Sequence, residues 1–180
     1  MTTNSFGRKG AILLSICLLT TLSCYAQHER DAAASCSFGY DTYYNERYNY
    51  SVSYPDNMQP LEPAALNDGL KFVSPDERAE FTVWGYFTRI VDPEATIGDE
   101  YRYVLENYGD CVTYKRLKGD YYVISGKKDG KIFYMVTKWR GEIGVTADLK
   151  YDEQLQDSYG KACAVILKSL EIEDSDILNP

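Results

Sequence analysis

Four consecutive strand-like segments in the second half of the chain constrain its fold more than any other feature. They cover residues 112–117, 121–126, 131–139 and 142–151. The turns between them are Gly119-Asp120, Asp129-Gly130 and Arg140-Gly141. Short connections rich in glycine and aspartate join neighbouring antiparallel strands, so the pattern predicts a four-stranded β-meander.

Three further strand-like segments precede this meander. In residues 48–54, large side chains alternate with small polar ones, which places the large ones on one face of a strand. Residues 70–73 form a short apolar run. Residues 79–87 carry bulky side chains on both faces, with Trp84 and Tyr86 on the same one, and this predicts a central strand covered on both sides.

Two segments show the spacing of an amphipathic helix instead. Between Thr96 and Gly109, apolar side chains recur every three or four positions; Thr96 and Asp99 resemble a capping box, and Gly109 supplies a stop. Residues 152–170 repeat the apolar spacing, with Cys163 in the stripe. The element order predicts an α+β fold, in which a mainly antiparallel sheet of six or seven strands has both helices packed on its faces.

The first 26 residues have the layout of a secretory signal peptide. A positive start at Arg8-Lys9 leads into an apolar run over residues 11–19, too short to cross a bilayer, and then into small residues. We expect cleavage between Ala26 and Gln27. The mature protein is then expected in the bacterial periplasm or outside the cell, without a membrane span.

The cysteines leave two questions open. A lipid anchor on Cys24 is an alternative to simple cleavage, although Thr21 stands where lipoprotein signals carry an aliphatic residue. The mature chain keeps Cys36, Cys111 and Cys163, an odd number that permits one disulfide at most. Cys36 and Cys111 are the candidate pair in an oxidising compartment, because Cys163 is expected to be a buried, inert thiol. Three unpaired thiols are the other interpretation.

The net charge limits the classes of partner that the protein can bind, and the chain length limits the number of domains. The formal net charge is −8, and loss of the signal peptide removes two basic residues and no acidic one. Such an acidic surface argues against nucleic acid and anionic membranes as partners, because both require a basic patch. The remaining length suits one domain at residues 46–172, between a flexible leader at residues 27–45 and an acidic tail at residues 173–180.

Residue types that carry common active-site chemistry are scarce. The single histidine, His28, lies in the leader, and no cysteines are spaced as in a zinc site. We therefore identify no catalytic, cofactor-binding or metal-ligating residue. Four acids near the first helix either complement its dipole or bind calcium: Asp92, Glu94, Asp99 and Glu100. The 17 tyrosines suit contacts with a partner or a sugar, and they equally suit a half-buried sheet face.

Several short stretches are informative when taken in order. They are residues 45–55 (NERYNYSVSYP), 74–76 (SPD) leading to 80–85 (EFTVWG), 112–118 (VTYKRLK), 120–126 (DYYVISG) and 131–134 (KIFY). Together they resemble secreted bacterial proteins of the PsbP-like family, over residues 45–172. The resemblance implies an antiparallel sheet with helices on both faces, an α/β/α sandwich. The family includes photosystem II subunits and Ran-binding nuclear-transport factors, so its fold does not select a function, and no functional residue carries over.

Two functional hypotheses follow. The first is an exported, non-catalytic binding or accessory protein of the bacterial cell envelope, without a cofactor, whose partner is an envelope protein or polysaccharide. The alternative is a carboxylate-dependent hydrolase of envelope polysaccharide, which needs two correctly spaced acids and leaves no sequence motif. The hydrolase requires those acids to face each other in a concave aromatic cleft, at least one with a pKa raised by burial.

Overall fold

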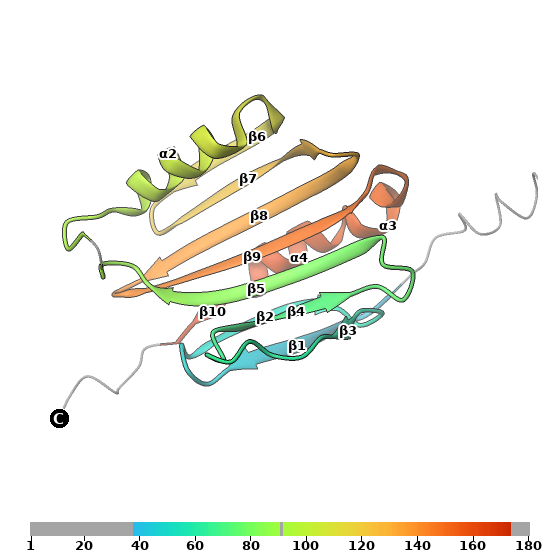
Figure 1. Cartoon of the computed structure of the whole chain (residues 1–180), viewed down its shortest axis with the longest axis horizontal. Coiled ribbons are helices and arrows are strands. Elements are labelled where there is room, and N and C mark those ends of the chain that lie inside the picture. Colours follow the sequence, from blue (N-terminus) through green and yellow to red (C-terminus); the bar gives the residue numbers. More distant parts are fainter. Residues whose placement is uncertain (1–37, 91, 174–180) are drawn as a thin grey trace, which may run out of the picture. The chain divides into compact units, whose positions relative to one another are not determined.

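A computed structural model describes residues 38–90 and 92–173. Its larger sheet has seven strands, and every neighbouring pair is antiparallel (Figure 1). In spatial order they are β3 (Gln59–Pro60), β4 (Gly69–Val73), β5 (Ala79–Phe87), β9 (Ile143–Asp152), β8 (Lys131–Arg140), β7 (Tyr121–Lys128) and β6 (Val112–Lys118). The predicted meander from β6 to β9 and the predicted antiparallel sheet are confirmed.

A second, smaller sheet was not expected. It holds β1 (Tyr40–Asn45), β2 (Tyr50–Pro55) and β10 (Glu171–Ile172), with β2 in the middle. The prediction of a flexible leader is therefore wrong for residues 40–45. Most side chains of β1 are exposed, and the strand pairs with β2 along its whole length. An edge strand held by backbone hydrogen bonds needs no apolar alternation, so no sequence pattern marks it.

The helices follow the predictions at one position and depart from them at the other. α2 (Ile97–Tyr108) begins with the Thr96–Asp99 capping box and ends at Gly109, where η1 (Gly109–Cys111) leads into β6. The helical segment expected at residues 152–170 begins one residue later, because β9 continues to Asp152, and it is divided into three pieces. The pieces are η2 (Glu153–Leu155), α3 (Gln156–Tyr159) and α4 (Ala162–Ser169). Gly160 lies at the break between α3 and α4, where its low helix propensity weakens the turn.

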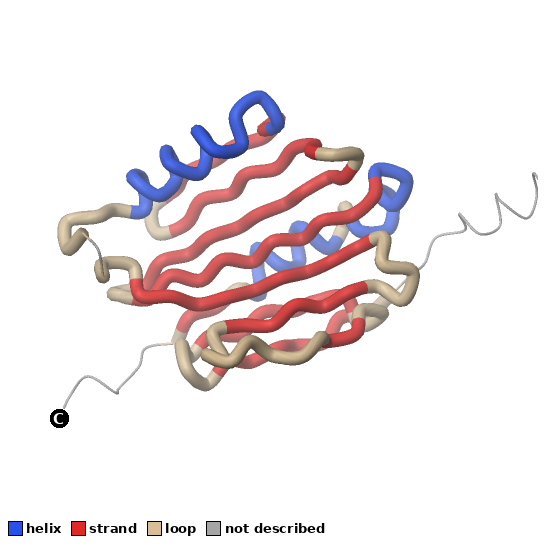
Figure 2. The backbone as a smooth tube through the Cα atoms, viewed as in Figure 1, coloured by secondary structure: helices blue, strands red, loops and turns tan. Residues whose placement is uncertain are grey.

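The two faces of the larger sheet have different covers (Figure 2). The main core lies on one face, where α4 and the small sheet enclose buried side chains that include Tyr50, Phe81, Leu149 and Ile166. On the opposite face, α2 packs against Tyr122, Ile124, Phe133 and Met135 of β7 and β8. The side chains of β5 on the α2 face remain partly exposed. Helix α2 therefore covers only the β6–β8 half of that face.

Several expectations concern other parts of the chain. The signal peptide, its Ala26–Gln27 cleavage site, Cys24 and Cys36 lie outside the described residues. Cys111 and Cys163 are partly buried and form no disulfide among the described residues. Because Cys36 is not one of these residues, the proposed Cys36–Cys111 pairing is untested. Within residues 38–90 and 92–173, every helix is too short or too polar to span a bilayer.

Candidate functional site

A cleft of about 230 Å³ lies beside α2, where the helix leaves the sheet uncovered. Four strands form its floor, through Trp84 and Tyr86 of β5, Thr146 of β9, Met135 of β8 and Tyr122 of β7. Four α2 side chains form its wall: Glu100, Val104, Asn107 and Tyr108. Strand register brings the floor together, because Trp84 is paired with Thr146 on the neighbouring strand. Directly paired residues point to the same side of a sheet.

Glu100 is the polar centre of this cleft. The Tyr86 hydroxyl lies 2.7 Å from both of its carboxylate oxygens. The Tyr122 hydroxyl donates to Oε1 at 2.9 Å, and the Trp139 indole Nε1 donates to Oε2 at 3.0 Å. The carboxylate of Glu100 on α2 is thus hydrogen-bonded to side chains from three strands, and both of its oxygens accept hydrogen bonds from the protein. The cluster fixes the aromatic rings and the helix relative to the sheet.

The phenols of this cluster remain neutral donors. Burial raises the pKa of Tyr86 well above its ordinary value, and the negative charge of Glu100 raises it further. The same two causes, in the same order, raise the pKa of Tyr122. Loss of a proton from either hydroxyl would place a second negative charge beside Glu100 in a poorly solvated site.

The size and lining of the cleft limit what it can bind. Its volume is below the roughly 300–1,000 Å³ of pockets that enclose a whole small-molecule ligand. The lining combines aromatic faces with a few polar groups, among them Asn107 and Thr146. The space suits one ring or one large side chain of a longer ligand, packed on Trp84.

A second hollow continues along α2 from the cleft. It has a volume of about 250 Å³ and is lined by Tyr108, Lys128, Asp129, Lys131, Phe133 and Lys150. Tyr108 lines both spaces. The side of α2 thus borders an aromatic end near Glu100 and a lysine-rich end near the β7–β8 turn.

Asp148 lies on the same sheet face as the cleft floor, two residues beyond Thr146 on β9. It is 4% exposed. Its Oδ2 pairs with the Lys150 ammonium at 2.7 Å, whereas its Oδ1 has no hydrogen-bond partner among the described residues. Burial raises the pKa of Asp148 above its ordinary value, and the charge of Lys150 opposes that shift.

The four acids near the start of α2 do not form one site. Asp99 closes the capping box by accepting from the Thr96 backbone N–H at 2.8 Å, and Asp92 accepts from the Glu94 backbone N–H at 2.9 Å. Glu100 turns away toward the sheet. Among the described residues no three histidine, cysteine or acidic side chains gather as metal ligands, so the structure gives the calcium interpretation no support.

The two acids required by the hydrolase hypothesis do not meet in the cleft. Glu100 is the one carboxylate among its described lining residues, and protein donors occupy both of its oxygens. Asp148 has the raised pKa but does not line the cleft. The geometry therefore favours binding over general acid–base chemistry at this site.

Patterns in the sequence predict only part of this arrangement. The alternation in residues 79–87 correctly placed Trp84 and Tyr86 on one face. Tyr122, Trp139 and Glu100 come from distant segments and share no local motif. Tyr48 and Tyr50 are buried in the main core, as the sheet-face interpretation expects, whereas Tyr86 and Tyr122 line the cleft and are hydrogen-bonded to Glu100.

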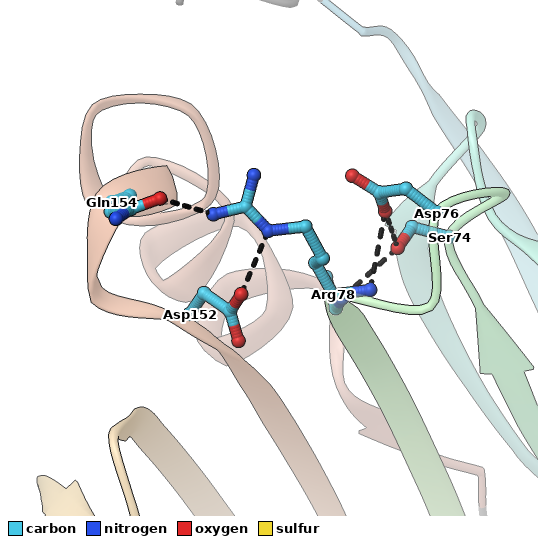
Figure 3. A network of polar contacts seen from close by, with 6 residues as sticks. Ser74, Asp76, Arg78, Asp152 and Gln154 are labelled. Atoms are coloured by element: carbon cyan, nitrogen blue, oxygen red, sulfur yellow. Dashed lines mark hydrogen bonds and ion pairs between the residues drawn. The ribbon is translucent and has the colours of Figure 1, made fainter.

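Another polar cluster, at the β4–β5 turn, has a structural role (Figure 3). The Ser74 hydroxyl donates to Asp76 at 2.6 Å and accepts from the Ala79 backbone N–H at 2.9 Å. Arg78 donates to Asp152 at 2.7 Å and to Gln154 at 2.6 Å. These contacts join the turn to the end of β9 and to η2.

Comparisons with known proteins identify the fold. No family model and no curated protein match the sequence. The structure is similar to cyanobacterial PsbP (CyanoP) from Synechocystis, with a TM-score of 0.56 and 14% identity over 78% of this chain and 98% of that one.

Two further solved structures share the architecture. A protein from Bacteroides thetaiotaomicron matches with a TM-score of 0.51 and 15% identity, over 74% of this chain and 48% of that one. The Ran-binding protein Mog1p of Saccharomyces cerevisiae matches with a TM-score of 0.51 and 8% identity, over 79% of this chain and all of that one (100%). The chain has a PsbP-like fold.

Proposed function

We propose that this protein is an exported, non-catalytic binding or accessory protein of the bacterial cell envelope, and that the cleft beside α2 is its ligand-binding site. The observation that carries the proposal is the aromatic cleft itself, where the one carboxylate among the described lining residues is bonded to three protein donors. A preorganised aromatic surface favours binding. The ligand is a segment of an envelope protein or polysaccharide that presents one ring or large side chain.

Binding to soluble fragments of envelope polysaccharide and to extracted envelope proteins tests this proposal. We expect saturable binding of one fraction in calorimetric titration, with no release of sugar reducing ends. Trp84→Ala should weaken binding about tenfold or more, because it removes the main aromatic face of the cleft. Tyr103→Ala is the control, since Tyr103 is an aromatic residue of α2 that does not line the cleft and is 66% exposed.

Two results would contradict the proposal. Binding that is unchanged by Trp84→Ala would place the ligand elsewhere. Release of reducing ends that is abolished by Asp148→Asn would favour the polysaccharide hydrolase.

Export is a separate part of the proposal, supported by the signal-like pattern of residues 1–26. We expect the exported form to begin at Gln27, which intact-mass measurement of the protein from cell-envelope and medium fractions would establish. A diacylated N-terminal Cys24 would show instead that a lipoprotein peptidase processes the chain.

A further inference from the structure

The lysine-rich hollow at the C-terminal end of α2 has the features of an anion site. Strand pairing places Lys128 directly opposite Lys131, at the ends of β7 and β8. Asp129 and Gly130 between them both have positive φ, as in a tight two-residue hairpin turn. Like charges placed directly opposite each other destabilise a strand pair, so this arrangement costs stability unless an anion lies between them.

Three carboxylates near this hollow are bonded to other side chains. Asp152 faces Lys131 across the strand pair, but its carboxylate is bonded to Arg78 (Figure 3). Glu80 is bonded to Lys71 at 2.7 Å, and Asp148 to Lys150. Asp129 is the one acid among the described residues that line the hollow. Neither Lys128 nor Lys131 makes an ion pair within the described part of the chain.

The hollow also has an aromatic surface. Phe133, 2% exposed, lies at its base, and Tyr108 forms its wall. The Lys128 ammonium lies 5.4 Å from the centre of the Tyr108 ring. Ammonium groups around aromatic faces suit a ligand that carries an anionic group on a flat or weakly polar ring.

An acidic sugar fits this arrangement better than an extended peptide does. The hollow and the cleft lie on a sheet face beside a helix, not at a sheet edge, so neither offers the row of free backbone groups that pairs with a peptide strand. Each space is about the size of one ring, and the two share Tyr108. Asn107 and Thr146 provide polar contacts for sugar hydroxyls.

We infer that the lysine hollow binds the carboxylate or phosphate group of an acidic sugar residue, while the cleft holds a neighbouring ring of the same polysaccharide. This inference rests on the proposed function, because it assigns a ligand class to the same side of α2. Lys128 and Lys131 supply the charge, Lys150 is held in place by Asp148, and Tyr108 contacts the ring.

Titration of the full mature protein with short oligoglucuronate, neutral oligoglucose and phosphorylated oligoglucose tests the inference. Wild-type protein should bind both anionic oligomers at least about tenfold more tightly than the neutral one, and added salt should weaken that preference. The relative affinities of oligoglucuronate and phosphorylated oligoglucose identify which anion the site prefers. The double substitution K128Q/K131Q should remove most of the preference. K115Q/K118Q on exposed β6 makes the same charge change away from the hollow and should leave it intact.

The outcomes separate this inference from the proposed function. Equal affinity for charged and neutral oligomers, or a preference that survives K128Q/K131Q, would overturn the inference. If Trp84→Ala still abolishes binding in that case, the cleft proposal stands alone. Tighter binding of an oligoglutamate peptide than of oligoglucuronate would also overturn the inference and indicate a protein ligand. A lysine-dependent preference that Trp84→Ala does not affect would support the anion site and contradict the cleft.

Discussion

Ionisation of Asp148 is costly in the folded state, because its carboxyl group is buried. Its folded pKa is raised by burial above the ordinary value of 3.8, so the native state binds its proton more readily than the unfolded state does. Native stability due to this group is therefore lost as the pH rises through the folded pKa. The partner Lys150 offsets part of this loss.

Asp148→Asn should therefore stabilise the protein in a pH-dependent way. Well below pH 3.8, the ordinary pKa, where the wild-type carboxyl is neutral in both the folded and the unfolded state, the two proteins should differ little. Near pH 7 the variant should be more stable, because the neutral amide avoids the burial penalty that raises the Asp148 pKa, and this gain should exceed the loss of the ion pair with Lys150. Denaturant unfolding at both pH values measures the difference. A variant that is less stable than wild type at pH 7 would show that the ion pair with Lys150 outweighs the cost of burial.

Gly144 decides whether the polar centre of the cleft can form. A Cβ atom at this position would lie 2.6 Å from Cζ of Tyr86, whose hydroxyl bonds to Glu100. Gly144→Ala should displace the ring, destabilise the protein by about 1–3 kcal/mol and alter the fluorescence of Trp139, which is bonded to the same cluster.

Gly98→Ala is the matched control for that substitution. Its Cβ would make only ordinary contacts, the nearest at 3.5 Å, within the first turn of α2. It should be neutral or slightly stabilising, because alanine favours helix. An unchanged unfolding curve and emission spectrum for Gly144→Ala would contradict the assigned position of Tyr86.

At the scale of elements, the stability of α2 depends on its capping interactions and on its contacts with the sheet. None of its residues is fully buried, so its attachment relies on partly buried apolar contacts and on Glu100. Thr96→Ala removes the side-chain cap and should cost about 1 kcal/mol. Hydrogen exchange should accelerate in α2 while the amides of β8 and β9 change little.

Thr113→Ala, on the exposed edge strand β6, provides the comparison for the cap substitution. It should leave exchange in α2 unchanged. Equal acceleration in α2 and in the central strands after Thr96→Ala would mean that the helix opens only with the whole fold.

For the whole molecule, the thiol of Cys163 reports on unfolding. It lies on α4 against the main core, and burial raises its pKa to about 11 from an ordinary value of 9.0. The thiolate is the reactive form, so this shift alone should slow alkylation at neutral pH about 100-fold. We expect the labelling rate to rise with denaturant in parallel with global unfolding, as measured by peptide mass spectrometry. Rapid labelling in native buffer would contradict the packing of α4.

Local interactions in the sequence determined much of the fold. The turns from Gly119 to Gly141 and the alternation between them predicted β6 to β9, because a hairpin is specified by its own turn and the adjoining residues. The ends of α2 followed from Thr96, Asp99 and Gly109 for the same reason. The alternation in residues 79–87 placed Trp84 and Tyr86 on one face before any partner strand was known.

Only the tertiary structure decided the division into two sheets and the position of the site. β1 has no apolar alternation, and it is a strand because β2 provides backbone partners. The cleft exists because β5 pairs with β9 across more than fifty residues of sequence, and because α2 covers half of one face. Cross-strand register brings Tyr86, Tyr122 and Trp139 to Glu100, and such long-range pairing leaves no short motif in the chain.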